Sequence, residues 1–285
     1  MSVEAPAPSA EQERILVIKH GALGDFVLAT GALAAIRAHH PAADITLMTT
    51  KPMFGLAEDC PAIDAIWLDE RPGWTRPLAL LMKARQIARG GYARVYDLQG
   101  SARTASYFHL ARLFGLRAEW CGKVRGCSHP LPQAGREAKH THERLTHILR
   151  TVGIASVPGP ALPWLTADLS RFALPEGTVL LVPGASPHHP EKRWPAENYA
   201  ALARSLTRRK LTPVVIGTAE EKPLGREITR DCQGARDLTG QTTLAEVHAL
   251  ALAATGAVGN DTGPMHLIAA AGIPSVVLFG AASDP

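Results

Sequence analysis

Several features that mark large classes of protein are missing from this sequence. Its four cysteines are scattered without a C-x-x-C pair, which argues against a disulfide framework and favours free thiols in a reducing compartment. The longest nearly unbroken apolar run, Phe26–Ile36, is about half the length of a membrane span. Residues 1–13 are acidic and rich in Pro and Ala, with no basic segment followed by an apolar one, so they predict a disordered leader rather than a secretory signal. We therefore expect a soluble, cytoplasmic protein.

Metal and dinucleotide signatures are also missing. Cys121, Cys127 and His129 resemble part of a zinc site, but no fourth ligand stands at metal-like spacing, so we expect no metal. The loop after the first predicted strand has two glycines without the G-x-G-x-x-G fingerprint. The second strand runs into residues 49–51 (TTK) instead of the acid that would bind a ribose. These absences argue against a nicotinamide-dependent oxidoreductase.

The composition fits a two-domain globular protein with an uneven distribution of charge. Its 285 residues are too many for one typical core. Residues 1–155 carry 19 Lys and Arg against 14 Asp and Glu, a net charge of +5, whereas residues 156–285 carry 11 against 12, a net charge of −1. The basic half, with Arg103 and the stretch 117–125, predicts an anionic partner such as an acidic glycolipid or the inner-membrane surface, although a solvated basic face explains the same excess. We expect no nucleic-acid partner.

The first half alternates strand and helix patterns. Short buried β-type runs are separated by longer helical patterns, and Ser101 is the expected N-cap of one of these helices. The expected strands are 14–19, 45–48, 63–68 and 92–98, and the expected helices are 25–39, 77–89, 101–114 and 142–152. Between 121 and 140 the pattern lapses into Gly, Pro, His and Arg, which is typical of a functional loop.

The second half repeats the alternation after a Pro-rich linker, residues 156–163. Its expected strands are 178–182, 213–216, 256–259 and 275–279, and its expected helices are 195–209, 221–231, 244–254 and 262–271. Strands separated by helices predict parallel sheets. We therefore predict two Rossmann-like, doubly wound α/β domains, 14–155 and 156–285, that face each other across a cleft, with ligands at the carboxyl ends of the strands.

The first two strand-end loops that could carry chemistry lie one in each half. The loop 20–25 (HGALGD) follows the first strand, and Asp25 has two readings: an N-cap of the next helix, or a functional carboxylate beside glycines that let a substrate approach. The loop 183–194 contains Lys192, which can offset pyrophosphate charge or simply be a surface lysine. His188 and His189 lack further ligands and fit a polar loop.

The other two loops lie in the second half. Glu220 and Glu221 follow a strand end, where a carboxylate can accept both ribose hydroxyls, and where an acidic first helical turn is the plainer reading. The loop 259–266 (GNDTGPMH) offers Asp261 as a helix cap, with Thr262 and Gly263 in the first turn exposing N–H groups to an anion.

Together these segments resemble glycosyltransferase family 9, the heptosyltransferase family of lipopolysaccharide core assembly. The resemblance runs from Ile15 to Pro285. It is carried by ILVIKHGALGDFVLAT at 15–30, KRWP at 192–195, GNDTGPMH at 259–266 and PSVVLFG at 274–280. Gly31 departs from the pattern, in which a proline usually follows the first-helix threonine.

The resemblance implies a B-type glycosyltransferase fold with the acceptor on the N-terminal domain and the nucleotide on the C-terminal domain. It further implies an ADP-activated heptose donor, inversion at the anomeric carbon, and no cofactor or required metal. Matched by position, Asp25 is the proposed base and Lys192 the pyrophosphate lysine. The remaining matches are Glu220 or Glu221 for the ribose, Thr262 and Gly263 for phosphate with Asp261 and His266 beside them, and Lys19 and Gly24 on the acceptor side.

Two alternatives to this function remain open on the sequence. One is a protein that binds a nucleotide sugar but has lost catalysis, against which the retained Asp25 argues. The other is a glycosyltransferase that acts on a different surface polysaccharide.

Overall fold

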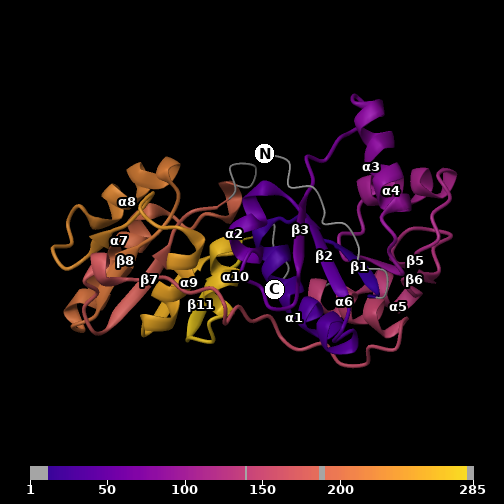
Figure 1. Ribbon diagram of the computed structural model, residues 1–285. Coiled ribbons are helices and arrows are strands. Elements are labelled where there is room, and N and C mark those ends of the chain that lie inside the picture. Colours follow the sequence, from indigo (N-terminus) through magenta and orange to yellow (C-terminus); the bar gives the residue numbers. More distant parts are fainter. Residues whose placement is uncertain (1–11, 139, 186–189, 281–285) are drawn as a thin grey trace. The chain divides into compact units, whose positions relative to one another are not determined.

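The computed structural model describes residues 12–138, 140–185 and 190–280. The chain divides into two compact units, Met1–Ala161 and Leu162–Pro285, here called unit 1 and unit 2. Both are α/β units built on a parallel sheet, as the sequence predicts (Figure 1). Most of the expected leader, and the pair His188–His189, lie outside the described residues.

Unit 1 is built on a six-stranded sheet in the order β3-β2-β1-β4-β5-β6, and every pairing in it is parallel. The strands are β1 (Arg14–Ile18), β2 (Asp44–Thr49), β3 (Ala65–Leu68), β4 (Arg94–Asp97), β5 (Glu119–Gly122) and β6 (His129–Pro130). The strand order reverses between β1 and β4, where Ile18 is paired with Asp97. Crevices at such reversals, beyond the carboxyl ends of the strands, are where doubly wound folds bind ligands.

The helices of unit 1 follow the amphipathic patterns of the sequence. They are α1 (Leu23–His39), α2 (Phe54–Ala57), α3 (Pro77–Arg89), α4 (Ala102–Leu113), α5 (Gln133–Glu137) and α6 (Thr141–Arg150). Helices α3 and α4 pack side by side (Figure 1). Their buried faces form one apolar cluster with β1 and β4 that includes Leu16, Leu80, Tyr107 and Trp120. Ser101 caps α4 as predicted, because its side chain accepts the N–H of Thr104.

Unit 2 has a five-stranded parallel sheet in the order β11-β10-β7-β8-β9. Its strands are β7 (Thr178–Val182), β8 (Thr212–Val215), β9 (Arg236–Asp237), β10 (Gly256–Asn260) and β11 (Ser275–Leu278). Its helices are α7 (Ala196–Arg208), α8 (Lys222–Thr229), α9 (Leu244–Ala253) and α10 (Gly263–Ala269). Here the order reverses at β7, so the ends of β7 and β10 border the expected ligand crevice.

The expectation of an irregular loop over 121–140 was wrong. The segment holds the end of β5, the two-residue strand β6 and the helix α5, which together extend the sheet at its edge. Cys, Gly, His and Pro dominate these short strands, so the β-branched runs that usually reveal a strand are missing. The strand β9 was missed because only two of its residues pair with β8, which is too short a segment to show a strand pattern.

Gly31 has a packing explanation in unit 1. A Cβ at this position would lie 2.0 Å from the carbonyl oxygen of Pro158, so only glycine lets the segment around Pro158 cross α1 at this point. The neighbouring Thr30 hydroxyl accepts the N–H of Ala161 at 3.1 Å and anchors the same crossing. The departure from the family pattern therefore matches a close backbone approach.

Candidate functional site

A buried lysine lies where the strand order of unit 1 reverses. Lys19 follows β1 directly and is only 3% exposed. Burial lowers the pKa of its ammonium group, and Arg144 lowers it further, while Asp25 and Asp97 raise it in opposition. A cation that is costly to bury is thus placed among carboxylates at the ligand-binding edge of the sheet.

Asp25 is not the cap of the first helix, as one reading of the sequence had it. The helix α1 begins at Leu23 with Ala22 in the N-cap position and no side-chain cap, so Asp25 is its third residue. Its Oδ1 accepts a hydrogen bond from the Thr141 hydroxyl at 3.2 Å, and Arg144 in turn donates to that hydroxyl at 3.1 Å. The carboxylate is half-buried and is bound by a residue of α6, and it does not cap α1.

Asp97 closes the same edge at the end of β4. It is fully buried, and its Oδ1 accepts the N–H groups of Gln99 and Gly100 at 3.2 and 2.8 Å. Burial raises the pKa of this carboxyl group, while the bond from Gly100 lowers it. The site around Lys19 therefore contains two carboxylates in different surroundings, one deeply buried and one half-buried.

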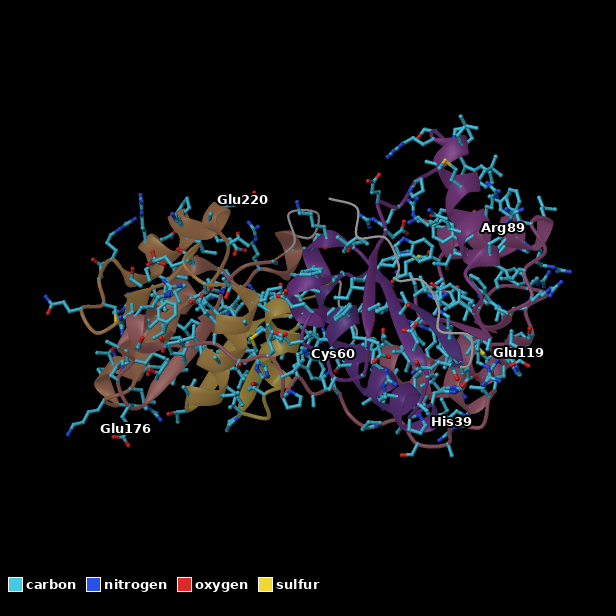
Figure 2. The ribbon with its side chains drawn as sticks, viewed as in Figure 1. His39, Cys60, Arg89, Glu119, Glu176 and Glu220 are labelled. Atoms are coloured by element: carbon cyan, nitrogen blue, oxygen red, sulfur yellow. The ribbon has the colours of Figure 1, made fainter. Side chains whose placement is uncertain are left out.

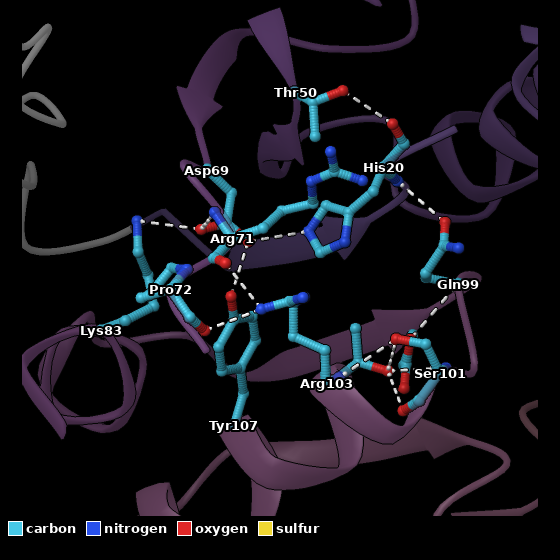
Figure 3. A network of polar contacts seen from close by, with 12 residues as sticks. His20, Thr50, Asp69, Arg71, Pro72, Lys83, Gln99, Ser101, Arg103 and Tyr107 are labelled. Atoms are coloured by element: carbon cyan, nitrogen blue, oxygen red, sulfur yellow. Dashed lines mark hydrogen bonds and ion pairs between the residues drawn. The ribbon is translucent and has the colours of Figure 1, made fainter. Parts of the chain in front are cut away.

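A second buried ionic cluster adjoins the first, and the sequence analysis missed it. The ring Nε2 of His20 lies 3.0 Å from Asp69 Oδ2, the Tyr107 hydroxyl donates to the same oxygen at 2.8 Å, and the Lys83 ammonium lies 3.6 Å from Oδ1 (Figure 3). Burial works to raise the pKa of Asp69, but the contacts from His20 and Tyr107 outweigh it and hold that pKa below its usual range. Asp69 could have been suspected as an acid directly after a strand.

The cluster ties the loop after β1 to the loop after β3. His20 also donates its backbone N–H to the Gln99 side chain at 3.0 Å, and its carbonyl accepts the Thr50 hydroxyl at 2.8 Å (Figure 3). Arg103 donates to the carbonyl oxygens of Arg71 and Pro72 at 2.6 and 2.8 Å. In this structure the Arg103 guanidinium therefore fixes the loop after β3; contact between Arg103 and an anionic acceptor remains a prediction.

In unit 2, the side chain of Asn260 connects the segments that follow β7 with the end of β10. The sequence did not predict this role. Its side chain is fully buried and donates to the carbonyl oxygens of Pro183 and Gly184 at 2.8 and 3.2 Å. Its Oδ1 accepts the Trp194 N–H and the Tyr199 hydroxyl, both at 3.0 Å. One amide thus joins two strand ends and the segment that contains Lys192.

Lys192 and His266 both approach Asp261. The Lys192 ammonium donates to Asp261 Oδ2 at 2.7 Å, and His266 Nε2 lies 3.8 Å from Oδ1. The side chains of Lys192 and Asp261 are each 21% exposed, so the pair stands at the surface of the crevice. The structure therefore brings together three of the residues that the sequence singled out.

Asp261 does not occupy the helix cap. The helix α10 begins at Gly263 with Thr262 as its N-cap residue, and the Thr262 side chain makes no capping bond. Thr262 thus precedes the first turn, and Gly263 is its first residue. The Asp261 carboxylate lies one residue too early to cap and pairs with Lys192 instead.

The two candidate ribose carboxylates differ in their surroundings. Glu221 accepts the backbone N–H of Thr218 at 2.7 Å and its hydroxyl at 3.2 Å, and a Cβ added to Gly184 would lie 1.8 Å from Glu221 Oε1. Glu220 is exposed (Figure 2). Glu221 is therefore the fixed carboxylate, packed against the end of β7.

Glu220 and Glu221 line a cavity of about 490 Å³ at the carboxyl edge of the unit 2 sheet. Its lining is contributed by the ends of β7 and β8, the turn before α8, the helix α9 and the start of α10, and includes Gly184, Arg193, Glu220, Glu221, Val247 and Thr262. The volume lies in the range of small-molecule sites, and apolar walls with a few polar groups are their usual character. The cavity can hold a ligand with a flat apolar part and an anionic or hydroxyl-bearing part.

The cysteines do not form a metal site. All four are buried and free, and within the described residues no three His, Cys, Asp or Glu side chains converge as metal ligands. Cys127 donates to the Gly122 carbonyl, and His129 lies 3.4 Å from Glu119 instead of meeting the thiols. Across the same part of the chain, none of the helices has the length and apolar character needed to cross a bilayer.

Two doubly wound units, with a cavity at the carboxyl edge of the second sheet, define a protein of the Rossmann-like class that binds ligands beyond its strand ends. The chain belongs to glycosyltransferase family 9 (heptosyltransferase), which residues 81–285 match. Lipopolysaccharide heptosyltransferase 2 of Escherichia coli (strain K12) is 28% identical over 293 residues, covering 95% of this chain and 83% of its own.

Solved structures share the fold. The glycosyltransferase family 9 protein from Veillonella parvula DSM 2008 superposes with a TM-score of 0.77 at 23% identity, covering 93% of this chain and 80% of its own. The E. coli heptosyltransferase WaaC with ADP-2-deoxy-2-fluoro heptose superposes with a TM-score of 0.74 at 19% identity, covering 95% and 90%. These likenesses support the predicted B-type glycosyltransferase fold.

Proposed function

We propose that this glycosyltransferase transfers heptose from ADP-heptose to a lipopolysaccharide-core-type acceptor, with inversion at the anomeric carbon. The observation that carries the proposal is the unit 2 cavity of about 490 Å³, whose lining includes Glu221, Arg193 and Thr262. The ion pair of Lys192 and Asp261 is formed by the residues next to Arg193 and Thr262 in the chain. The names of the relatives support the choice of sugar and acceptor, since one is a lipopolysaccharide heptosyltransferase and another was solved with an ADP-heptose analogue.

The donor site in this proposal uses the strand ends of unit 2. Lys192 leaves Asp261 to contact the pyrophosphate, because a charge-assisted bond to phosphate is stronger than a partly exposed ion pair. Thr262 and Gly263 approach the same phosphates. Glu221 accepts the ribose hydroxyls through Oε1, which faces the end of β7 while Oε2 is engaged by Thr218. The nucleotide sugar is then a substrate, and no further cofactor is required.

The acceptor side uses the charged edge of unit 1. An inverting transfer needs a base that takes the proton of the acceptor hydroxyl as the anomeric carbon is attacked. Asp25 suits this role because its Oδ1 is fixed by Thr141, while among the described residues no hydrogen bond to its other oxygen is found. The positive charge of Lys19 attracts the Asp25 carboxylate, and Gly24 directly precedes Asp25 on the same acceptor side.

The reaction is tested directly with ADP-heptose and a core acceptor that lacks its heptose. We expect ADP release, a product heavier by one heptose in mass spectrometry, and an inverted anomeric configuration in the proton NMR spectrum of the product. Tight ADP-heptose binding without turnover would instead identify a nucleotide-sugar-binding protein, and turnover with another nucleotide sugar only would identify a different polysaccharide pathway.

The donor site is tested separately by filling the cavity wall. In Gly184→Ala the new methyl group would collide with Glu221 Oε1, so we expect ADP affinity to fall about 10-fold, the order of effect of overpacking a tight contact. Gly159→Ala is the matched control, because a Cβ at Gly159 meets nothing within 4 Å. Equal ADP affinity in both variants, measured by calorimetry, would place the nucleotide elsewhere.

A further inference from the structure

The helix α3 in unit 1 has two contrasting faces. Leu80, Ala84 and Ile87 are buried in the core of the unit at the i, i+4, i+7 spacing of one helix face. On the opposite face Leu78 and Met82 are 75% and 64% exposed. A helix that presents large apolar side chains to both sides has more apolar surface than its own unit covers.

The exposed apolar surface is extended by neighbouring residues. Trp74, just before the helix, is 72% exposed, and Leu81 lies beside Leu78 and Met82 and is also exposed. Figure 1 shows α3 on the outside of unit 1, with its upper end standing clear of the other helices. We call Trp74, Leu78, Leu81 and Met82 the α3 apolar patch. Contiguous exposed apolar patches commonly mark interaction surfaces, whereas single exposed apolar side chains do not.

Positive charge adjoins the α3 apolar patch. One and two turns after Leu81 and Met82, Arg85 and Arg89 continue the outward face of the helix, and both are exposed (Figure 2 labels Arg89). Neither forms an ion pair with a described residue. Arg76 lies between Trp74 and the helix, and its guanidinium is 3.5 Å from the carboxylate of the exposed Glu70. Residues 71–89 contain no Asp or Glu. The outward face is thus apolar in its first half and cationic in its second.

We propose that the α3 apolar patch inserts into the surface of an anionic lipid bilayer, with Arg85 and Arg89 at the headgroups. Interfacial helices combine apolar side chains that enter the acyl boundary with basic residues that attract anionic lipids. A tryptophan at the edge of the patch suits the same boundary, where its ring is apolar and its N–H stays hydrated. The basic character of residues 1–155 adds long-range attraction.

The charge pattern favours a membrane over a second copy of the chain. Two copies that met through this face would bring the unpaired Arg85 and Arg89 of each close to the same residues of the other, which costs energy unless acids intervene. An anionic lipid surface neutralises them. This inference rests on the proposed function, because a lipid-anchored acceptor gives the enzyme a reason to visit a bilayer.

The proposal locates membrane contact on a defined surface, whereas the sequence suggested Arg103 and the stretch 117–125. Arg103 is engaged with backbone carbonyls of the loop after β3. The α3 apolar patch is distinguished from that stretch by its apolar side chains, so the two locations predict different effects of uncharged substitutions.

The test uses sedimentation of the full chain with phosphatidylcholine vesicles that do or do not contain phosphatidylglycerol. We expect binding to the anionic vesicles that falls as salt rises, because exposed charges are screened beyond about 10 Å at 0.1 M salt. In Leu78→Ser/Met82→Ser we expect the partition coefficient to fall at least 10-fold, since burial of each of these side chains is worth about that factor or more. Arg85→Gln/Arg89→Gln should lose the preference for anionic vesicles.

Matched controls separate the patch from general hydrophobicity and charge. Leu113 on α4 is 78% exposed, a fraction similar to the 75% of Leu78, but it does not belong to the α3 apolar patch. Leu113→Ser should therefore bind vesicles like wild type. Arg204→Gln/Arg208→Gln removes two exposed arginines at the same spacing on α7 and should keep most of the binding. Trp74 emission should shift to the blue on binding, and a Trp74→Phe variant identifies that signal.

Three results would overturn the proposal: no vesicle binding by wild type, equal binding by Leu78→Ser/Met82→Ser, or a wild-type dimer that this double variant converts to a monomer. The last result would assign the face to a second copy of the chain. Because the substituted side chains are exposed, the melting temperature should stay at the wild-type value. Vesicle binding needs neither donor nor acceptor, so failure of heptose transfer with intact vesicle binding would reject the proposed function and leave this surface assigned.

Discussion

The sheets of the two units end in surfaces of opposite character. At the reversal of strand order in unit 1, Lys19, Asp69 and Asp97 are nearly or fully buried, and each is held by charged or polar neighbours. At the equivalent reversal in unit 2, β7 ends at Val182 and β10 ends at Asn260, and an open cavity of about 490 Å³ follows. One edge concentrates charge and the other provides space.

The difference follows the chemistry proposed for each side. A nucleotide brings its own charges and needs room for its ring, so its site is best made from small residues, apolar walls and a few polar groups. A sugar hydroxyl is a weak nucleophile and needs a base whose ionisation is controlled by nearby charges. Asp25, Lys192 and Lys19 each contribute one part of this contrast, and each can be replaced separately.

The largest effect is expected at Asp25, the carboxylate of the charged edge. Asp25→Asn keeps the size of the side chain and can still accept from Thr141, but it cannot take a proton. Because a positioned base contributes 100-fold or more, we expect kcat for heptose transfer to fall by about 100-fold at least.

Stability and ADP affinity are the controls for this variant. Since Asp25 is not the N-cap of α1, its replacement breaks no cap. It removes a favourable charge in the first turn, worth a few tenths of a kcal/mol, and the attraction of that charge to Lys19. Melting temperature and ADP affinity should therefore stay near the wild-type values. Wild-type turnover in Asp25→Asn would move the base to another residue and remove the chemical reason for the charged edge.

A smaller effect is expected at Lys192, the cation nearest the open edge. Loss of one charge-assisted contact to phosphate costs on the order of 2 kcal/mol, so Lys192→Ala should weaken ADP binding roughly 30-fold in calorimetry. The variant also leaves Asp261 without its 2.7 Å partner, which adds repulsion toward the phosphates.

A double-mutant cycle with Asp261→Asn separates the two contributions. Relief of the defect in the double variant would mean that repulsion by the Asp261 carboxylate, once Lys192 is removed, dominates. Arg208→Ala, an exposed cation at the end of α7, is the charge-matched control and should bind ADP normally. ADP affinity that is the same in Lys192→Ala and Arg208→Ala would remove Lys192 from the donor site.

Strand-to-loop transitions were the part of the molecule that the sequence predicted well. The strand β7 and the helix α3 have the bounds that periodicity predicted. The strand is a short run of buried residues, and the helix repeats its buried apolar residues at helical spacing. The positions of Lys19 and Asp261 directly after β1 and β10, and of Lys192 in the segment after β7, followed from the same patterns. Local pattern was sufficient wherever a segment buries one continuous face.

Tertiary contacts were the part that local pattern could not supply. Both caps assigned to aspartates were wrong, because a helix start depends on backbone geometry that differs by one or two residues. His20, Asp69 and Tyr107 come from three separated segments, and Asn260 gains its role only from carbonyls 76 and 77 residues away. Contacts of this kind have no spacing signature in the chain.

The smallest effect concerns the stability cost of the charged edge, and Lys19 tests it. Burial lowers the pKa of Lys19 more than Asp25 and Asp97 raise it, so the folded environment disfavours the ammonium. Replacing a buried ion by an apolar side chain of similar volume is often neutral or stabilising by about 1 kcal/mol or more. Lys19→Met should therefore melt at or slightly above the wild-type temperature.

The pH dependence of that difference has a definite sign. Between the lowered pKa of folded Lys19 and the unfolded value near 10.4, the unfolded chain binds more protons, so wild-type stability rises with pH in this window. Lys19→Met lacks this gain, and its advantage in the free energy of unfolding should shrink as pH rises toward the unfolded pKa of lysine. Lys51→Met removes an exposed lysine in the same unit and is the control for the loss of one positive charge. If Lys19→Met were clearly less stable than wild type near neutral pH, Lys19 would be a structural ion-pair partner, and the charged edge would stabilise the fold instead of serving only the reaction.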